Sequence, residues 1–296
     1  MKRIVTLLTI IFGFTAAFGQ TFQTTVNYNP KREQPLVESH LAKFHVKGKE
    51  LIVIDVQEAT ANFEGYDGDD IVIEADPVAS KPAVVLPGFS LASSGLLPSD
   101  NLVHYRVLTN EPGVFGLSLT IPYTTGLKFG HYKVLVPKNI KLKVVFVISE
   151  LGAKMSFKNL SNGLEVEGTA PVITFDHISG PLTLSEGING HRIGGTEKII
   201  ISHLQQSNAQ FDSLEDTPLL NIITTHGDVD ISLPQEAKAT IQVDAGYGNL
   251  YSDLNMVKQR PAFPLVKSRY TGNVNGGGRM IVINAANGNV YLRKEK

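Results

Sequence analysis

Apolar and polar residues alternate in several short segments, and pairs of these segments are joined by a glycine. The clearest pair spans residues 220–233, with Gly227 at the joint. Its alternating apolar residues are Leu220, Ile222, Val229, Ile231 and Leu233. Alternation of this kind, bounded by Gly and Asp, is typical of a β-strand with one buried face. The segment therefore predicts two short strands joined by a tight turn.

The same two-strand pattern recurs along the chain. Copies surround Gly180, Gly248 and Gly288, and a copy at residues 52–63 has Ala59 in the place of the glycine. Successive glycines are 47, 21 and 40 residues apart, which fits one unit of about 20 to 23 residues, skipped once in each wide gap. A helical period is nowhere sustained for more than about ten residues, so the pattern predicts an all-β repeat.

A unit of this length cannot bury its inward side chains alone, so we expect stacked units to bury them against one another. The repeat therefore predicts one right-handed parallel β-solenoid (β-helix-like) domain over residues 50–296, with two loop excursions at about 77–129 and 252–278. Gly180 marks one turn, and Gly227, Gly248 and Gly288 are expected to supply left-handed backbone angles at three others. The alternative is a β-sandwich, whose strands also recur at short spacing.

The N-terminus has the form of a signal peptide. Lys2 and Arg3 precede an apolar run at 4–14, and small residues follow at 16–19. We expect cleavage after Gly19, which leaves a polar lead segment at 20–49 before the repeat. The apolar run is shorter than the roughly 20 residues that span a bilayer. The sequence thus predicts a protein exported to the periplasm, the cell surface or the medium, with no integral membrane segment after cleavage.

Composition removes several classes of function. Lys and Arg number 27 and Asp and Glu number 28, so the net charge of −1 provides no field that would recruit nucleic acid. Cysteine is absent, which excludes disulfides, thiolate metal sites and thiol nucleophiles.

Several pieces of the chain resemble a known family. They are residues 223–234, residues 239–241 leading into 248–250, residues 132–137, and the C-terminal pieces 276–278 and 287–290. Together they resemble the secreted bacterial "putative adhesin" family, a β-strand-repeat domain of unknown function, over residues 50–75 and 130–296. The resemblance implies a β-helix-like stack, export and a surface or envelope role. It implies no catalytic residues, and the long excursion at 77–129 departs from the family pattern.

Two groups of residues are candidate metal ligands. His177, His203 and His226 are 26 and 23 residues apart, so they could stack along one edge as a metal or pH-sensitive ladder. The other interpretation is three exposed histidines near turns. Asp67, Asp69 and Asp70 gather hard oxygen ligands but lack the full spacing of a calcium loop, so a solvated turn is favoured.

Two further groups bear on function. Asp228 and Asp230 share one strand face, as the paired carboxylates of a carbohydrate-active β-helix enzyme would, although such an enzyme also needs a groove. The tyrosines of the C-terminal repeats could form a carbohydrate or protein contact surface, or pack across strands. They are Tyr247, Tyr251, Tyr270 and Tyr291.

The sequence as a whole predicts a non-catalytic, exported, adhesin-like protein that presents an interaction surface at the cell envelope. Its ligand is expected to be a protein or a glycan, and no cofactor or metal is expected. The alternatives are a carbohydrate-active β-helix enzyme and a purely structural envelope component.

Overall fold

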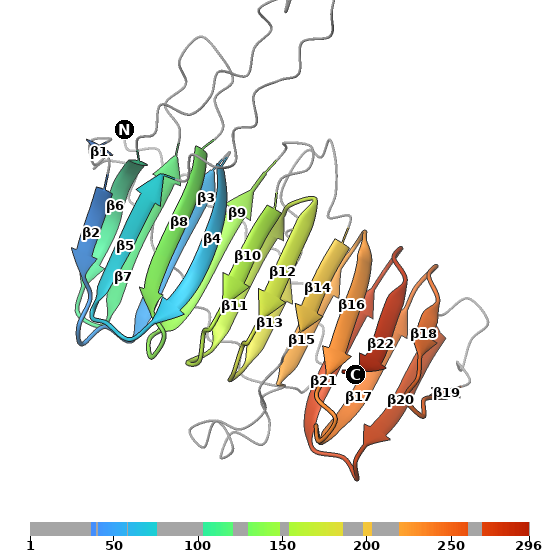
Figure 1. Cartoon of the computed structure of the whole chain (residues 1–296). Helices are drawn as coiled ribbons and strands as arrows, with labels where there is room; N and C mark the ends of the chain where they lie inside the picture. The colour runs from blue at the N-terminus through green and yellow to red at the C-terminus, as the bar shows by residue number, and fades with distance from the viewer. Residues whose placement is uncertain are drawn as a thin grey trace, which may run out of the picture.

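The structure is a computed structural model that describes residues 37–39, 41–57, 59–75, 103–120, 130–148, 154–185, 198–202, 219–259 and 268–295. Within these ranges every regular element is a β-strand, and the strands form two large sheets that face each other (Figure 1). The predicted all-β class is confirmed. The predicted signal peptide, residues 1–19, lies outside the described ranges.

Sheet A has twelve strands. In spatial order they are β1 (Val37–Ser39), β6 (Val103–Glu111), β7 (Val114–Thr120), β3 (Leu51–Gln57), β9 (Lys141–Val147), β11 (Leu164–Thr169), β13 (Leu182–Ser185), β15 (Leu220–Thr224), β21 (Arg279–Ala285), β17 (Ala239–Ala245), β20 (Ser268–Val274) and β19 (Val257–Gln259).

Sheet B has ten strands. In spatial order they are β18 (Leu250–Ser252), β22 (Val290–Lys294), β16 (Asp228–Leu233), β14 (Lys198–Ser202), β12 (Val172–Asp176), β10 (Lys154–Lys158), β4 (Ala59–Tyr66), β8 (Gly130–Pro137), β5 (Asp70–Ala75) and β2 (Leu41–His45).

Between β9 and β16 the chain alternates regularly between the two sheets. Each coil contributes one strand to each sheet, and neighbouring coils pair in parallel. Register partners Leu142 and Leu164 are 22 residues apart, Leu164 and Leu182 are 18 apart, and Leu182 and Leu220 are 38 apart. The strands therefore keep their register although the connections between them differ greatly in length.

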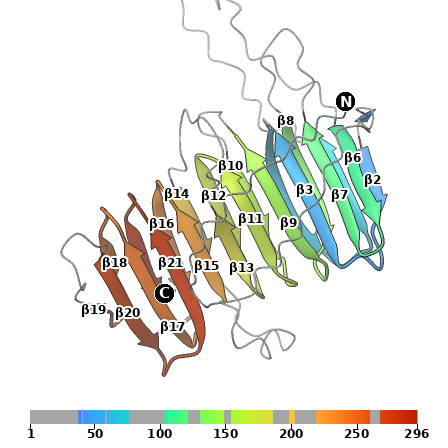
Figure 2. The ribbon, with the colours of Figure 1, turned by 180° about the vertical axis from the view of Figure 1, so that it is seen from behind.

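The order of the coils in space differs from their order in the sequence at both ends. The last coil, β21–β22, lies between β15–β16 and β17–β18, as Figure 2 shows for β21 between β15 and β17. Gly288 therefore lies between Gly227 and Gly248. At the other end β3–β4 lies between β7–β8 and β9–β10. The simple succession of units suggested by the glycine spacing from Gly180 to Gly288 is therefore wrong at the C-terminal end.

Antiparallel strands cover both sheets at the N-terminal end and sheet A at the C-terminal end. At the N-terminal end β6 pairs with β7 and β5 pairs with β8, with β1 and β2 outside them. At the C-terminal end β20 pairs with β17, and β19 with β20. An unpaired edge is a template for aggregation, and such covering strands protect it. The expectation of purely parallel pairing is corrected accordingly, because both predicted excursions and the lead segment supply strands to the sheets.

The space between the sheets is filled by inward apolar side chains. Because neighbouring coils are paired in register, like residues stack on one another. Phe63, Phe157 and Phe175 form a row in which the ring centroids are 5.1 and 5.2 Å apart. The ring planes are nearly parallel. All three side chains are almost completely buried. The alternation in the sequence therefore identified the core face correctly.

Glycine is required at the four predicted turns for two different physical reasons. Gly180 and Gly227 have φ values of 86° and 83°, which is the left-handed region that glycine tolerates best. The expectation of left-handed backbone angles is wrong for Gly248 and Gly288, whose φ values are not positive. A Cβ atom on Gly288 would lie 1.7 Å from the carbonyl oxygen of Gly227, and one on Gly248 would lie 1.9 Å from that of Gly288. Close stacking of coils, rather than the backbone angle, requires glycine at these two positions.

The residues that follow Gly227, Gly288 and Gly248 link these three turns by hydrogen bonds. The backbone N–H of Asn289 donates to Oδ1 of Asp228 at 2.8 Å, and the N–H of Asn249 donates to Oδ1 of Asn289 at 3.1 Å. Each turn thus satisfies a backbone donor of the next, which sets the register of the C-terminal coils.

Replacing Gly248 with Val should reduce stability by about 1–3 kcal/mol or more, because the new side chain overlaps the backbone of the adjacent turn. Gln242→Val is the control, since Gln242 lies half-buried on the outward face of β17, where a β-branched residue is tolerated. Chemical denaturation of both variants measures the difference. Equal midpoints would contradict the stacking of Gly248 on Gly288.

Candidate functional site

The outward faces of the two sheets carry the polar and aromatic side chains that could meet a ligand. On sheet B one row of register partners crosses seven strands, and unlike the core rows it changes character along its length. Its members are Asn62, Ser156, Thr174, Ile200, Asp230, Tyr291 and Tyr251. The row runs from small polar residues in the middle of the stack to aromatic ones at its C-terminal end.

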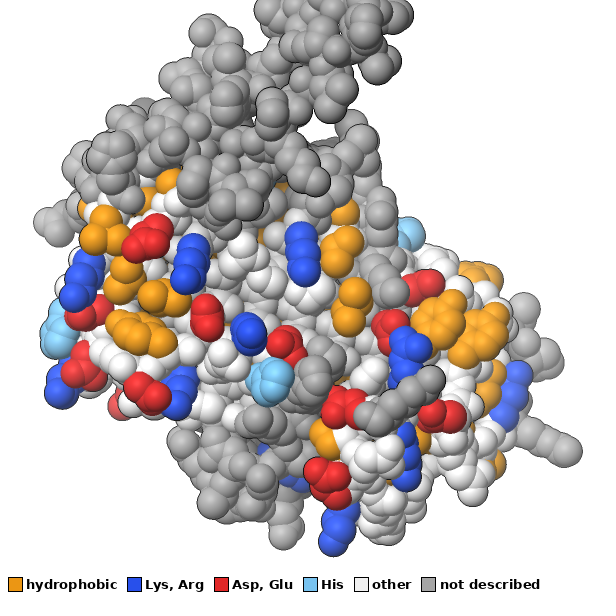
Figure 3. All heavy atoms as spheres, viewed as in Figure 1, with side chains coloured by type: hydrophobic (Ala, Val, Ile, Leu, Met, Phe, Trp, Pro, Cys, Tyr) orange, Lys and Arg blue, Asp and Glu red, His pale blue; other side chains and the backbone are white. Residues whose placement is uncertain are grey.

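An aromatic pair ends this row. Tyr251 on β18 and Tyr291 on β22 are register partners, their ring centroids are 5.1 Å apart and their planes differ by 12°. The exposed fraction of Tyr251 is 51%, and Tyr291 is half-buried. Figure 3 shows hydrophobic side chains gathered over this end of sheet B, beside acidic and basic ones.

Charged side chains adjoin the pair. Arg293 of β22 forms an ion pair with Asp230, and Asp228 lies two residues before Asp230 on the same face of β16. Loss of solvent contact raises the pKa of the Tyr291 phenol, and the negative charge of Asp228 raises it further. The two carboxylates and the aromatic pair therefore form one continuous surface, which we call the tyrosine face: Asp228, Asp230, Tyr251, Tyr291 and Arg293.

The sequence identified only part of this surface. It grouped four tyrosines, but Tyr270 lies on β20 in the other sheet, where it packs against the core and carries Lys258 5.7 Å from its ring centroid. Tyr247 protrudes from the turn before β18 with 94% of its surface exposed. Arg293 was missed, because only the insertion of β22 beside β16 brings it to Asp230.

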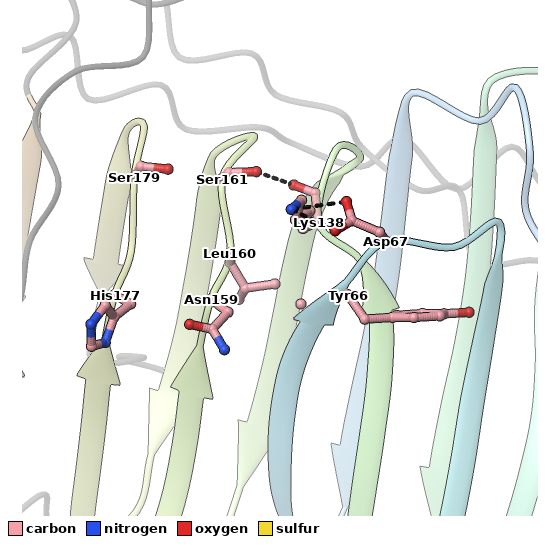
Figure 4. A pocket seen from close by; sticks show the side chains of 9 residues that line it. Tyr66, Asp67, Lys138, Asn159, Leu160, Ser161, His177 and Ser179 are labelled. Carbon is pink, nitrogen blue, oxygen red and sulfur yellow. Dashed lines mark hydrogen bonds and ion pairs between the residues drawn. The ribbon is translucent and has the colours of Figure 1, made fainter.

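A hollow of about 430 Å³ lies at the corner where strands of sheet B end (Figure 4). It is lined by the turns of successive coils: Gly65, Tyr66, Asp67, Lys138, Asn159, Leu160, Ser161, His177 and Ser179. Lys138 pairs with Asp67 at 2.8 Å, and Ser161 donates to the carbonyl oxygen of Lys138 at 2.8 Å. These contacts link the turns of neighbouring coils, so the hollow is a polar space between adjacent turns.

The structure does not bring His226 together with His177. His177 follows β12 at the end of a sheet B strand, whereas His226 precedes β16 in the turn that leads into sheet B. Because β12 and β16 run in the same direction, these two turns lie at opposite edges of the stack. His203 lies outside the described residues. His177 has a φ of 52° at the corner position where Gly65 and Asn159 stand in neighbouring coils, which indicates a turn role.

Each carboxylate of the candidate calcium turn has a cationic partner. Asp67 pairs with Lys138 and Asp69 with Lys47, at 2.8 and 3.1 Å. Asp70 contacts both Lys43 and His45, at 2.9 and 2.8 Å. Among the described residues no group of three or more His, Cys, Asp or Glu side chains is arranged to hold a metal ion.

One carboxyl group on sheet A stands out by its surroundings. Asp55 projects from the outward face of β3, where burial raises its pKa and a 2.5 Å hydrogen bond from Nε2 of Gln57 opposes that effect. Its register partner on β7, Ser118, is buried. The sequence did not single out Asp55, because alternation alone marks it as an ordinary outward residue.

In the part of the chain that the structure describes, no helix has the length and apolar character needed to cross a membrane.

Comparisons with known proteins are sparse. No family model matches the chain, and no curated protein matches it. One solved structure, described as a putative cell adhesion protein from Clostridium sporogenes, matches 88% of this chain and 100% of its own length, with a TM-score of 0.37 and 11% identity. At this TM-score the likeness does not establish a shared fold.

Asp70→Asn should lower the melting temperature at neutral pH. Hydrogen bonds from Lys43 and then His45 hold the pKa of Asp70 below its usual range, so the ionised form stabilises the folded state above the unfolded pKa of about 3.9. This contribution disappears as the pH falls through the lower folded pKa. The gap between variant and wild type should therefore close in acid, as thermal melts across pH 2–7 would show.

The matched control for this measurement is Asp67→Asn. The side chain of Asp67 is 84% exposed and forms an ion pair with Lys138, so solvent screens this pair and its loss should lower the melting temperature little. A gap for Asp70→Asn that does not change with pH would contradict the ionic origin of its effect.

Proposed function

We propose that this chain is a non-catalytic, exported, adhesin-like protein that presents an interaction surface at the cell envelope. In this proposal the two sheets are the opposite walls of one right-handed solenoid, closed at each end by antiparallel strands. The observation that carries the proposal is the contrast between the two sides of each sheet. Inward rows repeat apolar residues from coil to coil, whereas the outward row on sheet B changes at nearly every strand.

This contrast favours a binding surface on physical grounds. The described interior is occupied by packed side chains, so a ligand would meet the outward faces. Rigid strands hold outward side chains at fixed spacing, which is the arrangement that a recognition surface needs. An extended repeat protein uses its long exposed faces in this way.

A carbohydrate-active enzyme is the second candidate, because Asp228 and Asp230 share a face with Arg293 beside them. Two observations weigh against it. The Oδ1 atom of Asp228 already accepts the backbone N–H of Asn289, and Asp230 is paired with Arg293. The tyrosine face also lies away from the hollow at the corner of sheet B.

Export and surface exposure can be tested on intact cells. We expect the protein in the envelope fraction to begin at Gln20, as N-terminal sequencing would show, and added protease to degrade it without lysing the cells. A cytosolic protein that retains Met1 and resists protease would overturn the proposal. A polysaccharide hydrolysis screen with the purified protein, and with Asp230→Asn as its control, would reveal the enzyme alternative as turnover that the substitution abolishes.

A further inference from the structure

The tyrosine face combines an exposed aromatic pair with hydrogen-bonding groups of both signs. Tyr251 and Tyr291 stack across the last two strands of sheet B and leave half of Tyr251 open to solvent. Asp230 is the register partner of Tyr291, and Arg293 reaches Asp230 from the same strand as Tyr291. Adjacent exposed aromatic rings rimmed by polar groups, unlike a single exposed ring, are typical of a binding surface.

The position of the pair at the end of the sheet keeps it accessible. Among the described strands, sheet A is extended at this end by β20 and β19, whereas sheet B ends at the three-residue strand β18. So short a strand offers little edge for strand addition by another protein. What this end of sheet B offers a ligand is therefore its side chains rather than its backbone.

The charged side chains of the tyrosine face limit the class of ligand that it can bind. Asp230 is offset by Arg293, and Asp228 carries the remaining charge, so a polyanion would be repelled. Aromatic faces attract polarised C–H groups, while the carboxylates accept and the guanidinium donates hydrogen bonds. A pyranose ring with equatorial hydroxyls has both features, because its faces present C–H groups and its rim presents hydroxyls. Its flat shape also suits an open sheet face.

We propose that the tyrosine face binds a neutral saccharide chain of equatorially substituted pyranose units that crosses the strands, with one sugar ring stacked on the open face of Tyr251 and the hydroxyls of a later ring in the chain bonded to Asp230 and Arg293. This inference rests on the proposed function, because it names the ligand class of that interaction surface.

Isothermal titration of the full chain with cellohexaose and with chitohexaose tests the inference. We expect binding of at least one of the two, and about a tenfold loss of affinity in Tyr251→Ala because the stacking surface is removed. Tyr251→Phe keeps the ring and should keep the affinity. Tyr247→Ala is the matched control, since Tyr247 is more exposed but protrudes from a turn instead of the sheet face. Circular dichroism confirms that each variant is folded.

Chitosan hexaose, the free-amine form of chitohexaose, separates sugar stacking from attraction of a cation by the carboxylates. Binding of the amine form alone would overturn the proposal in favour of a cation site. Equal affinity of wild type and Tyr251→Ala for a sugar would also overturn it, while leaving the interaction function intact. Failure to bind either neutral sugar would overturn the saccharide proposal as well. If the protein nevertheless captures an envelope protein on intact cells, the proposed interaction function would still hold. Failure of both sugar binding and surface exposure would overturn the proposed function as well.

Discussion

Parallel pairing of coils in register places each residue above its equivalent in the next coil, and the remaining features of the molecule depend on this stacking. It brings Phe63, Phe157 and Phe175 into one buried row. It also brings the turns so close that Gly288 and Gly248 have no room for a side chain. Apolar burial between the sheets and backbone hydrogen bonds within them thus support each other. The parallel register is kept although the number of residues between register partners differs from coil to coil.

The first and last coils of such a stack have a neighbour on one side only. Their inward apolar side chains and the unpaired backbone of their outer strands would therefore be exposed to solvent. At both ends the chain places a coil out of sequence order, and it adds antiparallel strands to both sheets at the N-terminal end and to sheet A at the C-terminal end. Segments on the end coils close the core, among them Phe44 and Tyr105 at one end and Leu254 and Met256 at the other. Contacts between residues distant in sequence therefore hold both ends, which ties the termini of the described chain into the body of the stack.

The outward faces are where the coils differ, and the candidate site arises from such differences. The alternation of residues 220–233 placed Asp228 and Asp230 outward, and the tyrosines of the C-terminal repeats were recognised as a group. The sequence could not bring Arg293 to Asp230 or separate Tyr270 from Tyr251, because those relations depend on which strands become neighbours. For the same reason it could not exclude a histidine ladder, whereas the structure places His177 and His226 at opposite edges of the stack.

The local pattern by itself determined the strands, their buried faces and most of their turns, because period-two alternation and glycine act over a few residues. The glycine spacing also indicated stacked units. Only the tertiary structure decided the order of the coils, the antiparallel strands at the ends and the reason for glycine at 248 and 288. Equivalent coils have similar inward residues, so their sequences do not specify which coil lies next to which. Specific contacts between coils settle that order, such as those that Asp228, Asn289 and Asn249 make across three successive turns.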